Sequence, residues 1–227
     1  MSILVVIGTV AGREQQLPVV LKDLHNQTVK PHASVLIFDG CVEQEVDPHV
    51  ISVVVQNAEA TGTLDRLIWA DDCYDEDMLI LMDDDIRYPP NYIEEGIRLQ
   101  QLHGGVVGFH GKSMPRLNAR QEGLHFEQTV DKARAVHMLG AGVSFIPCAV
   151  AKAAIHSSMF RQYDCCCDHM VSFTAWQMGL KLTRVPSKRG WLKPFGVEGN
   201  SVWRTKAKER NRILTEMKSE GWPNART

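Results

Sequence analysis

Short apolar runs bounded by polar or glycine-containing turns recur along the first half of the chain. Four of them, Ile3–Ile7, Ser34–Phe38, Val50–Val55 and Leu79–Met82, have the length and composition of strands that are buried on both faces of a sheet. Gln15–Asn26, between the first two runs, instead has apolar residues at helical spacing and predicts a helix.

Two further segments, Thr61–Ala70 and Asn91–Leu102, also predict helices, and Pro90 sets the first turn of the second one. Strands and helices therefore alternate along this half. Such an order predicts an α/β fold with a mixed, mostly parallel sheet and helices on both faces. Polar turns follow the strands at one edge, which is the layout of a nucleotide-binding half.

The second half is less regular. Lys112–Asp131 is polar and predicts a long excursion from the sheet. Around it we expect three more strands, a segment that starts extended and becomes helical near Pro147, and two more helices. In chain order these elements are Val106–Phe109, Ala135–Leu139, Val143–Ile155, Asp168–Met178, Leu180–Val185 and a helix near Val202–Met217.

Length and composition indicate an ordinary globular protein. The chain has 227 residues, of which 44% are hydrophobic and 23% charged, so one domain over residues 1–227 can bury a substantial core. With 25 basic and 27 acidic residues the formal charge is −2, and no field of the whole protein attracts nucleic acid or an anionic membrane.

Nothing in the sequence predicts a signal peptide or a transmembrane segment. The start of the chain lacks a basic region before its short apolar run, and no run of about 18 apolar residues occurs. We expect a cytoplasmic protein, free or bound at the surface of a membrane. The six cysteines include the triplet Cys165, Cys166 and Cys167, whose spacing suits no disulfide framework, so we expect reduced, buried thiols.

Three carboxylates, Asp83, Asp84 and Asp85, leave the Leu79–Met82 strand at its C-terminal end. Ligands bind at this edge of an open α/β sheet. Adjacent carboxylates repel one another unless a cation compensates them, and clustered hard oxygens favour Mg²⁺ or Mn²⁺. The alternative is a solvated acidic turn in which Asp85 helps to start the next helix.

Three other positions can contact a nucleotide. The turn Gly8–Arg13 offers backbone amides and a guanidinium, although it lacks the G-x-G-x-x-G pattern. Asp39 can accept hydrogen bonds from a uracil or ribose edge, and Arg66 can reach a diphosphate. The alternatives are a plain strand-to-helix turn, an Asp-Gly turn and a surface arginine.

Asp168 opens a predicted helix. One interpretation is an N-cap, which would lower the pKa of its carboxyl group. Such a carboxylate can still accept a proton late in a displacement.

Cys165–His169 contains ligand-type residues without the paired C-x₂-C spacing of a zinc site. The tail contains Trp191 and Trp203 together with five basic residues, Lys188, Arg189, Lys193, Arg204 and Lys206. These side chains either close over an acceptor or phosphate, or form a solvated basic face.

Taken in order, these residues resemble the family 2 glycosyltransferases, inverting enzymes of the GT-A fold. The landmarks lie between Ile3 and Pro186, and the tail is unmatched. They are the opening strand and turn through Thr9, Phe38-Asp39-Gly40, Asn57 with Gly62, Leu81-Met82-Asp83-Asp84-Asp85 with Pro89 as the DXD-type stretch, Gly140-Ala141-Gly142, and Cys167-Asp168 before Gly179.

The resemblance implies a division of labour along the chain. Residues 1–103 form a nucleotide-sugar-binding half, 104–186 an acceptor half, and 187–227 a basic C-terminal tail. A UDP-sugar is the expected donor, and Mn²⁺ or Mg²⁺ the expected cofactor. The metal ligands come from Asp83, Asp84 and Asp85, with the family spacing to Pro89 favouring the last two. The donor contacts implied are Thr9, Arg13, Asp39, Asn57, Arg66 and Asp83.

Asp168 is implied as the general base that takes the proton of the acceptor hydroxyl during inversion. Two departures from the family pattern matter. Cys167 replaces the usual acidic partner of Asp168, and the Gln/Arg-rich motif of processive synthases is missing, which argues against a polymer synthase. The acceptor is a hydroxyl-bearing molecule, whether a glycan, a lipid-linked sugar, a protein or a modified nucleobase. The sequence does not specify the oligomeric state.

Two other functions fit parts of the sequence. A nucleotidyltransferase has a similar sheet and first turn, but it usually needs a lysine soon after that turn, and Lys22 lies nine residues past Arg13. That reading also leaves Asp168 unexplained. A non-catalytic sugar-nucleotide-binding module is the other alternative, and Cys167 is the feature that favours it.

Overall fold

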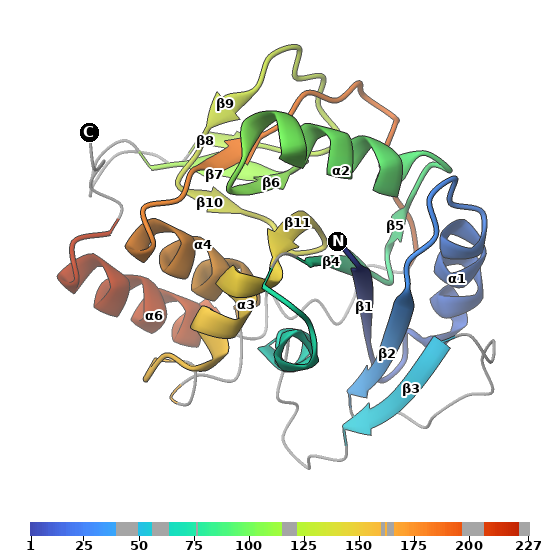
Figure 1. Ribbon diagram of the computed structural model, residues 1–227, viewed down its shortest axis with the longest axis horizontal. Helices are drawn as coiled ribbons and strands as arrows, with labels where there is room; N and C mark the ends of the chain where they lie inside the picture. Colours follow the sequence, from blue (N-terminus) through green and yellow to red (C-terminus); the bar gives the residue numbers. More distant parts are fainter. Residues whose placement is uncertain are drawn as a thin grey trace.

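The fold was analysed in a computed structural model (Figure 1). It describes residues 1–39, 50–55, 64–75, 77–114, 122–159, 162, 166–196 and 207–222. Several residues singled out in the sequence lie outside these ranges. They are Gly40, Asn57, Gly62, Cys165, Trp203, Arg204 and Lys206.

An eight-stranded mixed sheet forms the centre of the molecule, with the order β3-β2-β1-β4-β11-β6-β12-β9. The first four strands run parallel to one another, β11 is antiparallel to both of its neighbours, and β6 and β12 are parallel. The predicted fold class is therefore confirmed. The strands are β3 Val50–Val55, β2 Ala33–Asp39, β1 Ile3–Val10, β4 Met78–Asp83, β11 Val143–Pro147, β6 Val106–Gly108, β12 Leu182–Arg184 and β9 Arg134–Ala135.

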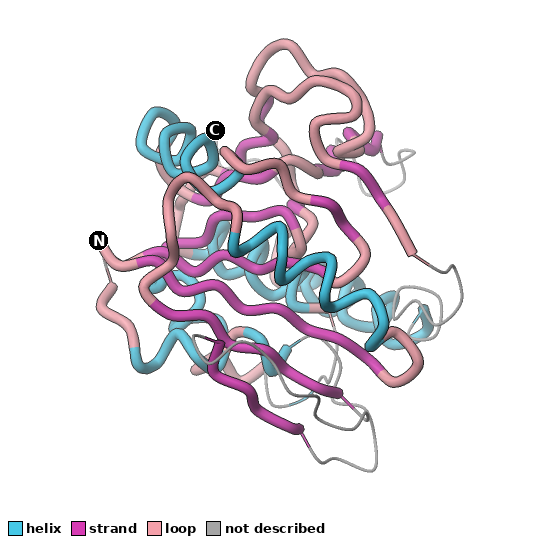
Figure 2. Tube along the Cα trace, turned by 90° about the vertical axis from the view of Figure 1, so that its right-hand side faces the viewer, coloured by secondary structure: helices cyan, strands magenta, loops and turns pink. Residues whose placement is uncertain are grey.

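Helices cover both faces of this sheet because its strands are apolar on both sides. Along β1, Val5 and Ile7 pack in one core with residues of α1 (Leu17–His25) and α2 (Tyr92–His103). Leu4 and Val6 point the other way and pack in a second core with α3 (Cys148–Ile155) and α4 (Cys167–Gln177). Figure 2 shows the helices on either side of the layer of strands.

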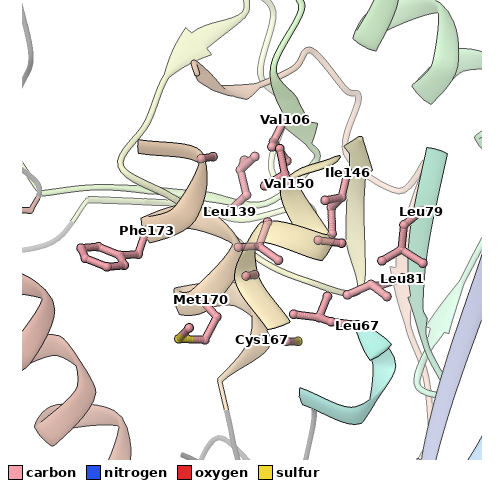
Figure 3. Close-up of a cluster of buried hydrophobic side chains, with 14 of the residues drawn as sticks. Leu67, Leu79, Leu81, Val106, Leu139, Ile146, Val150, Cys167, Met170 and Phe173 are labelled. Carbon is pink, nitrogen blue, oxygen red and sulfur yellow. The ribbon is translucent and has the colours of Figure 1, made fainter. Parts of the chain in front are cut away.

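Helix α4 is fixed in place by its apolar residues. Figure 3 shows Cys167, Met170 and Phe173 along it, with Leu139 and Val150 among the side chains of the same core. Residues three apart lie on one side of a helix, so this spacing gives α4 a continuous buried face. Helix α6 (Ala207–Ser219) packs against α4 from the outside (Figure 1).

The segment predicted to be helical over Thr61–Ala70 is helical from Leu64 onward, but in short 3₁₀ turns, and its first three residues lie outside the described ranges. Residues 64–72 form two 3₁₀ helices, η2 (Leu64–Arg66) and η3 (Ile68–Asp72). A 3₁₀ helix has three residues per turn, so residues three apart align along it. Leu67 and Ala70 have this spacing, and both are fully buried in the core that contains α3 and α4.

The single strand predicted over Ala135–Leu139 is wrong. It is two strands, β9 in the large sheet and β10 (Met138–Leu139) in a separate sheet with the order β10-β7-β8. The predicted polar excursion, Lys112–Asp131, is not free of strands. It contains β8 (Glu122–Leu124) and most of β7 (Gly111–Ser113), which begins one residue before it. Pairing between distant segments, which local patterns do not encode, decides both outcomes.

Three short elements complete the described part of the chain. A 3₁₀ turn, η1 (Glu14–Gln16), precedes α1, and β5 (Ile86–Arg87) pairs with β13 (Lys193–Pro194). The predicted tail helix begins at Ala207 in the part of the tail that is described. None of the helices found in the described ranges has the length and apolar character needed to cross a bilayer.

Candidate active site

Sheet register gathers the polar strand ends at one edge. In the parallel strands, Val10 pairs with Asp39 and Gly8 with Asp83. Strand β11 starts at this same edge because it runs antiparallel to β4, with Val143 opposite Met82. The turn that precedes β11 therefore lies beside the acidic residues.

A cavity of about 270 Å³ opens at this edge. Every described residue among the implied metal ligands, donor contacts and base lines it, although these residues come from segments far apart in the sequence. The lining includes Thr9, Arg13, Asp39, Arg66, Asp83, Asp84, Asp85 and Asp168. Asn57 lies outside the described residues.

Asp84 is the buried member of the acidic triplet. Its Oδ2 accepts a 2.7 Å hydrogen bond from Thr9 Oγ1, and its Oδ1 lies 2.6 Å from the guanidinium of Arg13. Burial raises the pKa of Asp84 to about 6, even though Arg13 and the Thr9 hydroxyl act in the opposite direction. Both carboxylate oxygens are therefore engaged inside the protein.

Asp83 and Asp85 are the more exposed members of the triplet, with side chains 36% and 43% exposed against 4% for Asp84. Arg66 Nη1 lies 2.7 Å from Asp83 Oδ1, and Arg13 Nη2 lies 2.5 Å from Asp85 Oδ2. Burial raises the pKa of Asp85, as does the charge of Asp83. Two accessible carboxylates at an interval of two residues fit a hard divalent cation such as Mn²⁺ or Mg²⁺.

A glycine makes room for the Asp83 carboxylate. A Cβ atom at Gly142 would lie 1.9 Å from Asp83 Oδ2, which no side chain permits. Gly8 is also confined, since its Cβ would lie 3.1 Å from Arg66 Cδ. Glycine is thus required at position 142 by the acidic side chain beside it.

Tyr88 holds this arrangement together, and the sequence did not point to it. Its hydroxyl accepts a 2.8 Å hydrogen bond from the Asp83 N–H and donates a 2.7 Å bond to the Gly142 carbonyl. Burial raises the pKa of Tyr88 well above its ordinary value, so the hydroxyl keeps the proton that it donates. The ring packs 4.8 Å from that of Tyr92, also buried.

Replacing Tyr88 by phenylalanine is expected to lower the free energy of unfolding by about 1–3 kcal/mol, because the change removes the partner of two buried backbone groups. Tyr92→Phe is the matched control. The Tyr92 hydroxyl is buried and has no hydrogen-bond partner among the described residues, so its removal should be neutral or stabilising. Urea unfolding of both variants tests this expectation, and equal losses would contradict it.

Asp168 lies in the first turn of α4, so the interpretation of this residue as the N-cap is wrong. The N-cap is Cys166, which has a φ of 75° and is in the left-handed conformation. No other non-glycine residue that the structure describes has a positive φ. Asp168 Oδ1 accepts a 2.9 Å hydrogen bond from the His169 N–H and lies 2.8 Å from His169 Nδ1. The carboxylate thus bonds the residue that follows it.

These contacts stabilise the ionised form of Asp168. Burial favours the protonated acid, but the imidazole of His169, its two hydrogen bonds and the charge of Lys112 outweigh burial and lower the pKa of Asp168 to about 2. The side chain is 23% exposed and lines the cavity. It is therefore an ionised carboxylate that is oriented by its neighbour.

A second group of ligand-type atoms lies at the start of α4. One atom each of Cys166, Asp168 and His169 can be chosen so that all lie within 4.8 Å of one another. A thiolate, an imidazole and a carboxylate suit Zn²⁺ better than Mg²⁺. Cys166 and Cys167 are buried in the core beside α4, which agrees with the expectation of buried thiols.

The sequence did not identify the residues that form the remaining wall of the cavity. His110, Phe126 and Arg210 line it, the last of them from α6. Arg184 holds the loop that carries Phe126, because its buried guanidinium donates to the Leu124 and His125 carbonyls at 3.3 Å. Local sequence could not identify this wall, because it depends on how the small sheet and α6 pack.

Trp191 does not line this cavity. Its ring packs 4.8 Å from Phe109 and 6.0 Å from Tyr92, against the core that contains α2. Lys188, Arg189 and Lys193 are exposed, as the alternative of a solvated basic face predicts. Trp203, Arg204 and Lys206 lie outside the described residues.

Solved structures with this arrangement of elements were found by comparison. S. aureus TarS 1–349 in complex with UDP-GlcNAc aligns with a TM-score of 0.66 and 14% identity over 100% of this chain and 68% of its own. GalNAc-T7 with UDP, GalNAc and Mn²⁺ aligns with a TM-score of 0.65 and 14% identity over 95% of this chain and 48% of its own. No family model matches the sequence, and no curated protein matches it.

Both neighbours are glycosyltransferases of the GT-A type, and this chain has the GT-A fold. The predicted fold is confirmed. The chain spans about half of GalNAc-T7, at 48% of its length. At identities this low the likeness establishes the fold, and the narrower assignment to family 2 stays a prediction.

Proposed function

We propose that this protein is a metal-dependent, inverting glycosyltransferase that moves a sugar from a UDP-sugar to a hydroxyl acceptor. The observation that carries the proposal is the single cavity in which the acidic end of β4 and the ionised Asp168 meet. Glycosyl transfer needs a group that stabilises the departing diphosphate and a base for the acceptor hydroxyl. The acidic end of β4, through a bound metal ion, would supply the first, and Asp168 would supply the second.

The metal would be held by Asp83 and Asp85, because their carboxylates are the more exposed ones in the cavity, while both oxygens of Asp84 are engaged with Thr9 and Arg13. A bound Mn²⁺ or Mg²⁺ supplies charge compensation to the departing diphosphate. Asp84 would act as the support that holds Arg13 in place. This register differs from the Asp84–Asp85 pair that family spacing favours.

The donor would lie along the edge formed by β1, β2 and β4. Asp39 would accept hydrogen bonds from the uracil or ribose; it lines the cavity, and Thr9 lies near the end of the adjacent strand. Arg13 and Arg66, which also line the cavity, would meet the phosphates. The Nε of Arg13 is buried and has no hydrogen-bond partner among the described residues, so it can donate to a ligand. Asn57 stays a prediction from the resemblance.

Asp168 would take the proton of the acceptor hydroxyl as that oxygen attacks the anomeric carbon. A carboxylate with a pKa of about 2 is a weak base toward a free alcohol. The hydroxyl becomes much more acidic as its bond to the sugar forms, so the proton is transferred late. The bond from the anomeric carbon to the diphosphate breaks on the opposite side, and the configuration inverts.

Product analysis tests the reaction class. Incubation with UDP-sugars and Mn²⁺ is expected to release UDP, by transfer or by slow hydrolysis, and the anomeric configuration of the product is expected to be inverted. Incubation with a nucleoside triphosphate and a sugar phosphate is the control for nucleotidyl transfer. Release of pyrophosphate there would favour a nucleotidyltransferase, and UDP-sugar binding without any release of UDP would favour a binding module.

A further inference from the structure

The first turn of helix α4, which carries Asp168, is anchored by three parts of the molecule. The apolar residues of the helix pack in one of the two cores. The Ser172 hydroxyl donates to the Asp168 carbonyl at 2.6 Å and accepts the Leu139 N–H at 3.2 Å, which ties the turn to β10. Arg66 Nη2 donates to Cys167 Sγ at 3.7 Å. The backbone of Asp168 is therefore fixed beside the cavity, whereas the direction of its carboxylate depends on its own rotamer.

The imidazole of His169 fixes that direction. Its side chain is 1% exposed and that of Asp168 is 23% exposed, so the protein encloses the ring while the carboxylate reaches the cavity wall. His169 Nδ1 lies 2.8 Å from Asp168 Oδ1, and the His169 N–H donates to the same oxygen at 2.9 Å. A ring that close packing holds in one orientation thus binds one end of a carboxylate that could otherwise rotate.

The two oxygens of the Asp168 carboxylate are not equivalent. Both of these hydrogen bonds end on Oδ1. Hydrogen bonds to the charged form make an oxygen less basic, so Oδ2 is the oxygen that would take a proton. Since Asp168 lines the cavity, a carboxylate held through Oδ1 can present Oδ2 to a bound hydroxyl.

The bond between the two side chains can persist through proton transfer. An ionised carboxylate only accepts hydrogen bonds, so His169 Nδ1 is the donor in the resting site. When Oδ2 takes the proton of the acceptor hydroxyl, Oδ1 becomes the carbonyl oxygen of a neutral acid and still accepts from Nδ1. The ring gains and loses no proton in this step. Its contribution is orientation, as for the outer partner of a metal ligand.

We propose that His169 is the positioning residue of the general base, and that its Nδ1–H holds Oδ1 of Asp168 so that Oδ2 faces the acceptor hydroxyl. This inference rests on the proposed function, since it concerns the base of the same reaction. The acidic residue that usually precedes the base in family 2 is Cys167 here, and its sulfur accepts from Arg66. The residue that follows the base supplies the hydrogen bonds to its carboxylate.

Two substitutions of His169 separate the hydrogen bond from the ring. In His169→Asn the side-chain amide nitrogen can take the place of Nδ1, whereas in His169→Gln it lies one carbon further out, near the place of Nε2. The measurement is UDP release from a UDP-sugar with Mn²⁺. His169→Gln is expected to lower kcat about 10–100-fold, the usual effect of losing an outer partner, and to leave the KM for the UDP-sugar unchanged. His169→Asn is expected to keep most of the wild-type kcat.

His137→Gln is the matched control. His137 is half-buried, and its Nδ1 accepts the Met114 N–H at 2.8 Å, but it is not among the residues that line the cavity. This variant is expected to lose stability in urea unfolding and to keep the wild-type kcat. A wild-type kcat in His169→Gln, or equal losses of kcat in His169→Asn and His169→Gln, would overturn the proposal.

A measurement on the wild-type protein does not depend on how the variants fold. Two-bond ¹H–¹⁵N NMR correlations of protein labelled with ¹⁵N-histidine, recorded with Mg²⁺, show which ring nitrogen carries a proton. The proposal expects a proton on Nδ1 of His169. A ring that is protonated only at Nε2 would contradict it, because such an Nδ1 cannot donate to Asp168.

The two proposals fail in different ways. If the wild-type protein neither binds nor releases UDP, the glycosyltransferase assignment fails, and the NMR measurement still decides whether His169 donates to Asp168. If UDP is released and His169→Gln keeps the wild-type kcat, the transferase assignment stands and the positioning assignment fails.

Discussion

Asp168→Asn is expected to lower kcat by a factor of about 10²–10⁴, the usual contribution of a positioned general base, and to leave the affinity for UDP unchanged. Asparagine keeps the size of the side chain but cannot take a proton. The measurement is the rate of sugar transfer together with UDP affinity by calorimetry. An undiminished kcat would remove Asp168 from the reaction.

Stability must be measured in the same variant, because Asp168 also contributes to folding. Its pKa in the folded protein lies below the ordinary value of 3.8, at about 2. The unfolded chain therefore binds more protons between these pH values, so the stabilisation is present above about pH 4 and is lost as the pH falls toward 2. At neutral pH the Asp168→Asn variant should lose this contribution to the free energy of unfolding, which is about 2 kcal/mol.

Asp77→Asn separates the two effects. Asp77 is likewise buried, and hydrogen bonds from the backbone N–H groups of Ser2 and Tyr74 lower its pKa against the effect of burial. It does not line the cavity. We expect this variant to lose stability while its kcat stays at the wild-type value, so a loss of kcat in Asp168→Asn alone identifies chemistry.

Asp85→Asn is the second change with a large expected effect. It removes one of two carboxylates proposed to hold the metal, and the activating concentration of Mn²⁺ is expected to rise by at least about 10–100-fold, since even outer-shell changes have effects of this size. Activity as a function of Mn²⁺ concentration measures this, and an unchanged curve would exclude Asp85 as a ligand.

Asp84→Asn is the comparison for the metal register. The pKa of Asp84 is raised to about 6 in the folded protein. The folded protein therefore binds more protons than the unfolded chain between about pH 4 and 6, and the contribution of Asp84 to the free energy of unfolding falls as the pH rises through that range. The variant should lose this pH dependence and keep its Mn²⁺ activation curve. A shift of that curve as large as in Asp85→Asn would restore the family register.

Much of the nucleotide-binding half could be predicted from local pattern. The strands that became β1, β2, β3 and β4 are continuous apolar runs, and burial on both faces of a sheet requires such runs. The acidic end of β4 was visible for the same reason, because three carboxylates directly after a buried strand must lie at the sheet edge. The type of the short helices around Leu67 was not predictable, since packing on the sheet selected it.

The sequence by itself determined the sheet class, the edge that carries the carboxylates and the presence of a carboxylate at the start of a late helix. Only the tertiary structure decided how exposed each carboxylate is, because Thr9 of β1 and Arg13 of the turn after β1 engage both oxygens of Asp84. It also decided that Tyr88 supports Asp83 and that Arg210 lines the cavity. Their positions follow from strand pairing and helix packing between segments distant in the chain, and no local pattern records such contacts.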